Sequence, residues 1–167
     1  MNTIYKTILV VLFLASGFCA SAQNKSYISN HKIIAAALSQ RYGIPAPVIL
    51  SIAAIESSGG SGPAAKVLNN HFGIVGKNSF VNDKGHKSRY KEYSNEIASY
   101  IDFCNLITRK SFYNRLKGNP DCSVWIKAIS HCGYSEQPGM WEQKVYSVLY
   151  SLKFVPAIGF ASLASFK

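Results

Sequence analysis

Residues 46–57 form an apolar segment that constrains the fold more than any other part of the chain. Pro45 and Pro47 lie at its start, and proline suits the first turn of a helix, where its missing N–H has no partner. The segment runs into Ser-Ser-Gly-Gly-Ser-Gly, a glycine-rich stretch that ends a helix readily. We therefore predict an apolar helix from about Ala46 to Ser57.

Glu56 lies at the end of this segment and is the only acidic residue before Asp83. Ile49, Ile52 and Ala53 precede it by seven, four and three residues, so they share its face of the helix. Burial over apolar neighbours raises the pKa of a carboxyl group. A carboxyl that is protonated near neutral pH suits a general acid, and glycoside hydrolysis often uses one. The alternative is an exposed glutamate near a helix C-terminus, where the helix dipole disfavours it.

Helical spacing recurs along the rest of the chain, apart from one stretch that predicts strands. Gly43 ends a helix that begins near Ile33, and Ser94 is the expected N-cap of a helix that has Glu96 in its first turn and continues through Ile107. The other expected elements are a short strand at 72–74, a hairpin of strands at 79–81 and 86–91, and helices at 124–131 and 140–153. This pattern predicts an α+β fold that is mostly helical, with one small β-hairpin.

The first 22 residues are typical of a secretory signal peptide. Lys6 precedes an apolar run at residues 8–14, and Ala-Ser-Ala at 20–22 supplies a small-x-small cleavage pattern. The run is too short to span a bilayer comfortably, so a retained anchor is the less favoured alternative. A lipoprotein site at Cys19 is less favoured still, because Phe18 stands where such sites have a small residue. We expect a secreted or periplasmic protein without a stable membrane anchor. The predicted parts are a signal peptide at 1–22, one globular domain at 23–154 and a C-terminal tail at 155–167.

Basic residues outnumber acidic ones and give the chain a formal net charge of +10. For an exported protein, such a charge fits nucleic acid, an anionic membrane or an acidic wall polymer. The basic residues are scattered, and the one dense patch, at residues 84–91, has the simpler interpretation of a solvated hairpin. We predict a monomer that binds no nucleic acid. Because no Cys-x-x-Cys motif occurs, we also predict no metal site and no cofactor.

Three cysteines lie beyond the predicted cleavage site: Cys104, Cys122 and Cys132. Export permits one disulfide with one thiol left over. If residues 122–132 form a continuous helix, its ends lie about 15 Å apart, which exceeds the limit of about 7 Å for a disulfide. A disulfide that uses Cys104 is therefore expected, with three buried free thiols as the alternative.

Three short motifs carry a resemblance to a known family. Glu-Ser at 56–57 is followed by Gly60, residues 69–74 read Asn-Asn-His-Phe-Gly-Ile, and residues 133–138 read Gly-Tyr-Ser-Glu-Gln-Pro. In this order and at these spacings they resemble the bacterial glucosaminidase family, which includes the flagellar peptidoglycan hydrolase domain and many autolysins. The resemblance covers about residues 32–154. It implies a lysozyme-like fold with a small β-hairpin lobe, whose cleft binds the glycan strands of peptidoglycan.

The resemblance also implies roles for single residues. Glu56 matches the catalytic acid, and Tyr134 matches a tyrosine that the family needs in its cleft. The positions that match the cleft floor are Asn70, Phe72 and Gly73. Trp141 follows the Tyr134 loop closely, and we predict that its ring stacks on a sugar.

The chain departs from the family pattern in ways that affect its chemistry. An aromatic residue common in relatives is replaced by Gly59, and Glu136 and Gln137 replace a threonine and an aspartate. The short hairpin offers Asp83 as a second catalytic carboxylate, and an inverting enzyme needs such a base roughly 6.5–9.5 Å from the acid. Two alternatives stay open: Asp83 only forms the turn, and the 2-acetamido group of the substrate acts as the nucleophile.

The resulting prediction is a peptidoglycan hydrolase, an endo-acting β-N-acetylglucosaminidase that cleaves the β-1,4 backbone with Glu56 as general acid. A lytic transglycosylase or muramidase on the same fold is one alternative. A wall-binding module that has lost catalysis is another, and the short hairpin and the missing aromatic residue favour it.

Overall fold

The computed structural model describes the backbone of residues 3–81 and 87–152, and the side chains of residues 23–81 and 87–152. The predicted tail at 155–167 and the hairpin tip with Asp83 lie outside this range. The elements in chain order are α1 (Thr3–Tyr42), α2 (Ala46–Glu56), α3 (Pro63–Leu68), α4 (Glu96–Thr108), α5 (Tyr113–Leu116), α6 (Cys122–Ile129), a π-helical turn η1 (Ser130–Tyr134) and α7 (Pro138–Leu152). The mostly helical character is confirmed.

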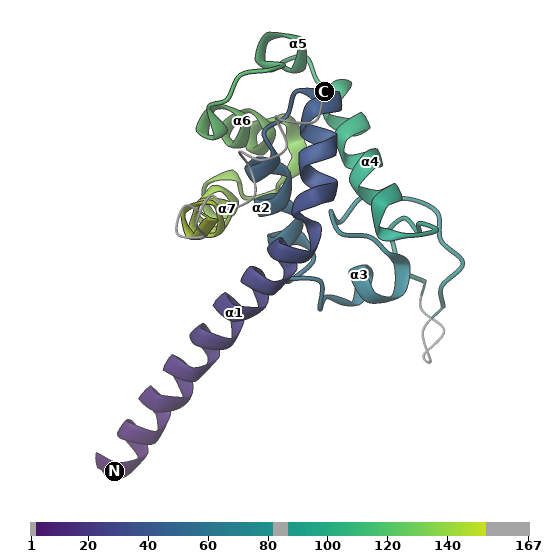
Figure 1. Ribbon diagram of the computed structural model, residues 1–167. Coiled ribbons are helices and arrows are strands. Elements are labelled where there is room, and N and C mark those ends of the chain that lie inside the picture. Colours follow the sequence, from purple (N-terminus) through teal and green to yellow (C-terminus); the bar gives the residue numbers. More distant parts are fainter. Residues whose placement is uncertain (1–2, 82–86, 153–167) are drawn as a thin grey trace.

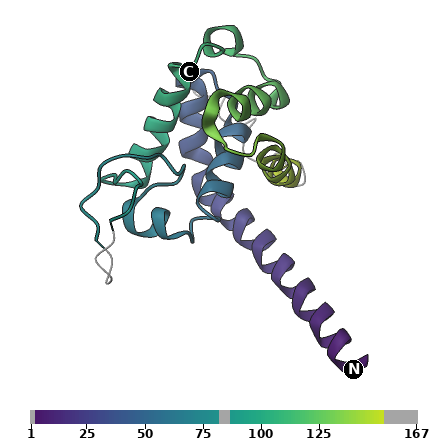
Figure 2. The same cartoon turned by 180° about the vertical axis from the view of Figure 1, so that it is seen from behind.

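Helix α2 lies at the centre of the core. Eight of the nine positions from 46 to 54 are buried, with Pro47 as the exception, and the helix contacts α1, α6 and α7. Figure 1 shows α2 between α1 and α7, while the N-terminal part of α1 extends away from the body. Figure 2 shows the same arrangement from behind. Within the described residues, no helix is long and apolar enough to cross a membrane.

The junction between α1 and α2 depends on Gly43. Its φ of +67° is readily available only to glycine, and this left-handed residue ends α1 as predicted. A side chain here would also meet the chain near α5, because a Cβ would lie 2.9 Å from the Gly118 nitrogen. The same approach allows the Gly118 N–H to donate to the Gly43 carbonyl at 2.9 Å.

The segment predicted to form a β-hairpin lobe contains no strand among its described residues. Two isolated antiparallel bridges pair Val75 with Tyr90 and Val81 with Lys87. The Asn78 amide donates to the carbonyls of Ser88 and Tyr90 at 2.6 and 2.8 Å, which occupies acceptors that a regular ladder would use. The segment predicted as a strand at 72–74 is a loop. The chain therefore doubles back as expected, but side-chain bonds replace much of the ladder.

Other expectations need correction. The N-cap of α4 is Asn95 and not Ser94, since the Asn95 side chain accepts a hydrogen bond from the Ala98 N–H at 2.9 Å. The expected disulfide through Cys104 is wrong. Cys104 is a free thiol in the core, and burial raises its pKa to about 12. Cys132 is also a free thiol, and it donates to the Ile129 carbonyl.

The loop at residues 69–74 is organised by the buried side chain of Asn70. Its amide nitrogen donates to the carbonyls of Ile74 and Lys91, both at 2.8 Å. Its oxygen accepts from the backbone N–H groups of Phe72 at 3.3 Å and Ile74 at 3.1 Å. Because Asn70 is fully buried, these four bonds satisfy a polar group that would otherwise be costly.

This network predicts a large effect for the isosteric change Asn70→Asp. A carboxylate oxygen would replace the amide nitrogen and face two carbonyl oxygens, which leaves both without a donor. The free energy of unfolding should fall by about 3 kcal/mol or more, as measured by urea denaturation. Asn30→Asp, the same change on the exposed surface of α1, should stay within about 0.5 kcal/mol of the wild type. A similar small effect for both variants would contradict the assigned role of Asn70.

Candidate active site

Glu56 is the last residue of α2, and its carboxyl group faces a cleft. Oε1 accepts a hydrogen bond of 2.6 Å from the indole N–H of Trp141, which lies on α7. Burial raises the pKa of Glu56 above its ordinary value, while the Trp141 bond and the positive charge of Lys144 oppose this rise. The net shift is upward, so a proton stays on Glu56 to higher pH than on an exposed glutamate.

The loop after Glu56 folds tightly because it contains glycine at strained positions. Gly60 has a φ of +79°, and a Cβ there would lie 3.0 Å from the Tyr27 ring on α1. The buried Ser57 hydroxyl accepts the Gly60 N–H at 2.9 Å. These contacts keep the loop against α1 and away from the cleft in front of the carboxyl group.

Tyr134 forms another wall of the cleft and lies at the end of the π-helical turn. Gly133, with a φ of +81°, lets the chain leave this turn. The Tyr134 hydroxyl donates to the carbonyl of Phe72 at 2.7 Å, and its ring meets the Trp141 ring edge to face at 5.6 Å. Burial raises the pKa of Tyr134 well above its ordinary value, so it is neutral at physiological pH. Tyr134 therefore connects the loop at 69–74 with α7.

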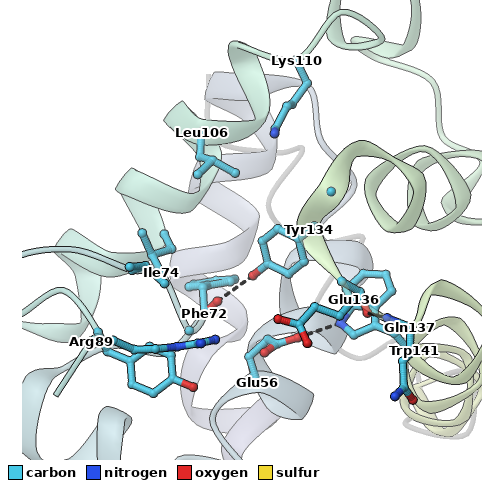
Figure 3. Close-up of a pocket in the computed structure, with 15 residues that line it drawn as sticks. Glu56, Phe72, Ile74, Arg89, Leu106, Lys110, Tyr134, Glu136, Gln137 and Trp141 are labelled. Atoms are coloured by element: carbon cyan, nitrogen blue, oxygen red, sulfur yellow. Dashed lines mark hydrogen bonds between the residues drawn. The ribbon is translucent and has the colours of Figure 1, made fainter.

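The resulting cavity measures about 550 Å³. Figure 3 shows Glu56 at its floor, with Tyr134 and Trp141 on one side and Arg89 on the other. A second cavity of about 320 Å³ lies between the loop after α2, α3 and Tyr90, and shares Glu56 and Gly73 with the first. A further cavity of about 260 Å³, beside Trp141 and Lys144, is also lined by Glu56, so this residue is shared by several adjoining hollows.

Most residues that the sequence identified come together here. Five of them line the larger cavity: Glu56, Phe72, Gly73, Tyr134 and Trp141. Asn70 lies behind the cleft, where its side chain binds backbone groups. Asp83 lies outside the described residues. For Trp141 the structure shows a bond to Glu56, and the stacking of its ring on a sugar stays a prediction.

Three charged residues of the cavity were not identified as site residues from the sequence. Arg89 and Lys110 line it and give its edge positive charge. Glu136 lines it as well, and Figure 3 shows its side chain extending from the Tyr134 loop in the direction of Glu56. The available signal for Glu136 was its place within the motif Gly-Tyr-Ser-Glu-Gln-Pro, next to Tyr134. A carboxylate at this cavity wall is a candidate for chemistry in its own right.

In this mostly helical fold, a half-buried carboxyl group at the end of the central helix faces an open cleft, an arrangement that suits glycoside hydrolysis. The family to which the chain belongs is identified from its sequence. The model of the Glucosaminidase family, described as mannosyl-glycoprotein endo-beta-N-acetylglucosaminidase, matches residues 32–154. The chain belongs to this family, which confirms the prediction of a glycoside hydrolase. No protein with a curated description matches the sequence significantly.

Several solved structures share the fold. The glycoside hydrolase domain of FlgJ from Salmonella typhimurium is 23% identical, with a TM-score of 0.64, and the match covers 86% of this chain and 99% of that one. The catalytic domain of the autolysin Auto from Listeria monocytogenes is 16% identical, with a TM-score of 0.62 and coverages of 78% and 85%. A peptidoglycan hydrolase from Sphingomonas sp. A1 is 20% identical, with a TM-score of 0.61 and coverages of 85% and 97%.

The raised pKa of Glu56 predicts how Glu56→Gln changes stability with pH. Below the ordinary glutamate pKa, Glu56 is protonated in both the folded and the unfolded state, so its ionisation does not affect the free energy of unfolding. As pH rises, the unfolded state releases its proton first, so the wild type loses stability up to the folded pKa. The glutamine variant escapes this loss because it cannot ionise.

We therefore expect Glu56→Gln to gain stability relative to the wild type as pH rises from the ordinary glutamate pKa to the raised pKa of folded Glu56, measured by denaturant unfolding at several pH values. Glu92→Gln is the control of opposite sign. Glu92 accepts bonds from the Ser79 N–H and hydroxyl, which lower its pKa, so its contribution is lost as pH falls. A Glu56→Gln difference that does not change with pH would show that the carboxyl has an ordinary pKa.

Proposed function

We propose that the protein is an exported endo-β-N-acetylglucosaminidase that hydrolyses the β-1,4 glycan backbone of peptidoglycan. The observation that carries this proposal is the half-buried Glu56 carboxyl group that faces the cleft and accepts the hydrogen bond from Trp141. Family membership supports the reaction class. Peptidoglycan as the substrate is supported by the similar peptidoglycan hydrolase and autolysin folds, and by a basic chain with Arg89 and Lys110 at the cavity. Export is supported by residues 1–22 of the sequence.

In this proposal Glu56 donates its proton to the glycosidic oxygen as the bond between that oxygen and the anomeric carbon breaks. The carboxylate that forms keeps the hydrogen bond from Trp141, which stabilises its negative charge. Burial gives the group a proton to donate, and Trp141 limits how far the pKa rises. The two opposing effects suit a group that must both hold and release a proton.

Tyr134 positions the cleft in this mechanism. Its hydroxyl donates a hydrogen bond to the Phe72 carbonyl, and this bond holds the Tyr134 ring against the loop at 69–74. Its edge-to-face contact with Trp141 fixes the indole that holds Glu56. Asn70 supports the same loop from behind, and we assign it to positioning and not to sugar contact. Gly73 leaves room beside the acid, because a Cβ there would lie 3.3 Å from Glu56 Oε2.

The second catalytic group has three candidates. Asp83 is the carboxylate of the hairpin, Glu136 is a carboxylate of the cavity wall, and the 2-acetamido group of the substrate needs no protein base. Asp83→Asn and Glu136→Gln separate them in one assay. A large loss in one variant identifies that residue as the base, and full activity in both leaves the acetamido route.

Glu56→Gln should reduce the release of reducing ends from purified sacculi by about 10²–10⁴-fold, the usual contribution of a general acid. Glu92→Gln, an exposed glutamate away from the cleft, should keep wild-type activity. Mass spectrometry of the wild-type products should find reducing N-acetylglucosamine ends. Reducing N-acetylmuramic acid would indicate a muramidase, and a 1,6-anhydro end a lytic transglycosylase. Sacculus binding without turnover by the wild type would contradict the enzyme proposal and support a wall-binding module.

A further inference from the structure

A second group of chemically capable side chains lies on the other side of the loop at 69–74. His31 comes from α1, His71 from the loop and Glu96 from the first turn of α4. Figures 1 and 2 both show α1 and α4 side by side, and the two helices are in contact. One ligand atom of each residue lies within 4.8 Å of the other two. The cleft and its proposed chemistry use none of these three residues.

Each ring nitrogen of His31 faces an oxygen atom. Nδ1 lies 2.7 Å from the Tyr27 carbonyl, which only accepts, so Nδ1 carries a proton. Nε2 lies 3.1 Å from the Glu96 carboxylate oxygen. In neutral His31 these two atoms would both be acceptors facing each other. Either a second proton or a metal ion must bridge them.

The surrounding hydrogen bonds match those of a metal site. A histidine that binds a metal usually donates its other N–H to a carbonyl or similar acceptor, which fixes the ring. His31 does this with the Tyr27 carbonyl. His71 Nδ1 lies 2.6 Å from the Tyr27 hydroxyl, which in turn lies 2.8 Å from the Tyr100 hydroxyl. When Tyr27 donates to Tyr100 and accepts from His71, the other nitrogen of His71 keeps its lone pair for a ligand.

The burial of the two histidines and the distances between the three ligand atoms also suit a metal ion. His31 and His71 are 7% and 6% exposed, whereas the Glu96 side chain is 46% exposed and opens the group to solvent. Zinc binds imidazole nitrogen and carboxylate oxygen at about 2.0–2.2 Å in tetrahedral geometry, which separates its ligands by about 3.3 Å. The His31–Glu96 pair already has this spacing, and the widest separation must close by about 1.5 Å at most. Rotation of the half-exposed Glu96 side chain contributes to that movement.

We propose that His31, His71 and Glu96 form a binding site for a divalent transition-metal ion, with Zn²⁺ as the best match and a water molecule in the open fourth position. Two imidazoles and one carboxylate are a common zinc ligand set. The ion would join α1, α4 and the loop at 69–74. That loop carries Phe72 and Gly73 of the cleft, so the metal would hold one cleft wall without contacting the substrate. The spacing of cysteines could not reveal this site, because its ligands are separated by 40 and 25 residues and include no cysteine.

The first test is titration of chelator-treated, purified protein with Zn²⁺, followed by calorimetry and thermal unfolding. We expect saturable binding of one ion with a dissociation constant in the micromolar range or below, and an increase in Tm. Co²⁺ should give the visible absorption bands of a tetrahedral nitrogen and oxygen site. No saturable binding, or binding without Co²⁺ bands and without a Tm change, would overturn the proposal in favour of a protonated His31 paired with Glu96.

Variants assign the ion to these residues. Glu96→Gln and His71→Gln should each weaken Zn²⁺ binding at least 10-fold and abolish the Tm increase. Glu96→Gln changes a half-exposed side chain, so it is the variant expected to fold normally, as checked by circular dichroism. His131→Gln is the matched control, because His131 and Glu142 form a similar pair at 3.4 Å outside the three-residue group. Equal weakening by His131→Gln, or none by Glu96→Gln, would overturn the assignment.

Discussion

The burial of one carboxyl group at the end of the most apolar helix is the constraint on which the rest of the site depends. Helix α2 is buried nearly throughout, so its last side chain begins in the core and ends at the cleft. Burial raises the pKa of Glu56, and the short bond from Trp141 opposes that rise. The second effect requires α7 to lie against α2, which links the C-terminal helix to the chemistry that we propose.

The loop at 69–74 has two supports that act from opposite sides. Asn70 satisfies backbone groups of the loop and of Lys91, and the Tyr134 hydroxyl holds the Phe72 carbonyl on the cleft side. The proposed metal site would add a third support through His71. The first half of the motif Asn-Asn-His-Phe-Gly-Ile thus places the backbone of the loop, and its second half, Phe72 to Ile74, faces the cleft, with Gly73 beside the acid.

The sequence predicts those features well that depend on residues close together in the chain. The prolines, the apolar run and the glycines define α2, and three motifs in order identify the family and bring most site residues into one cavity. Prediction from the sequence fails where a side-chain hydrogen bond joins residues that are far apart in the chain. The Asn70 bond to the Lys91 carbonyl spans 21 residues and the Trp141 bond to Glu56 spans 85, so neither role is visible as a spacing. The sequence also predicts two strands in the hairpin that the structure does not show, because side-chain hydrogen bonds from Asn78 take the place of hydrogen bonds between the two backbone segments.

Direct titration of the Glu56 carboxyl group tests the central claim. The side-chain carboxyl carbon of selectively ¹³C-labelled glutamate can be followed by NMR against pH and assigned with Glu56→Gln. The account predicts a Glu56 pKa above its ordinary value in the wild type, and a still higher pKa in Trp141→Phe, which removes the donated hydrogen bond but keeps the burial. A wild-type pKa at or below the ordinary glutamate value, or a lower pKa in Trp141→Phe, would contradict it.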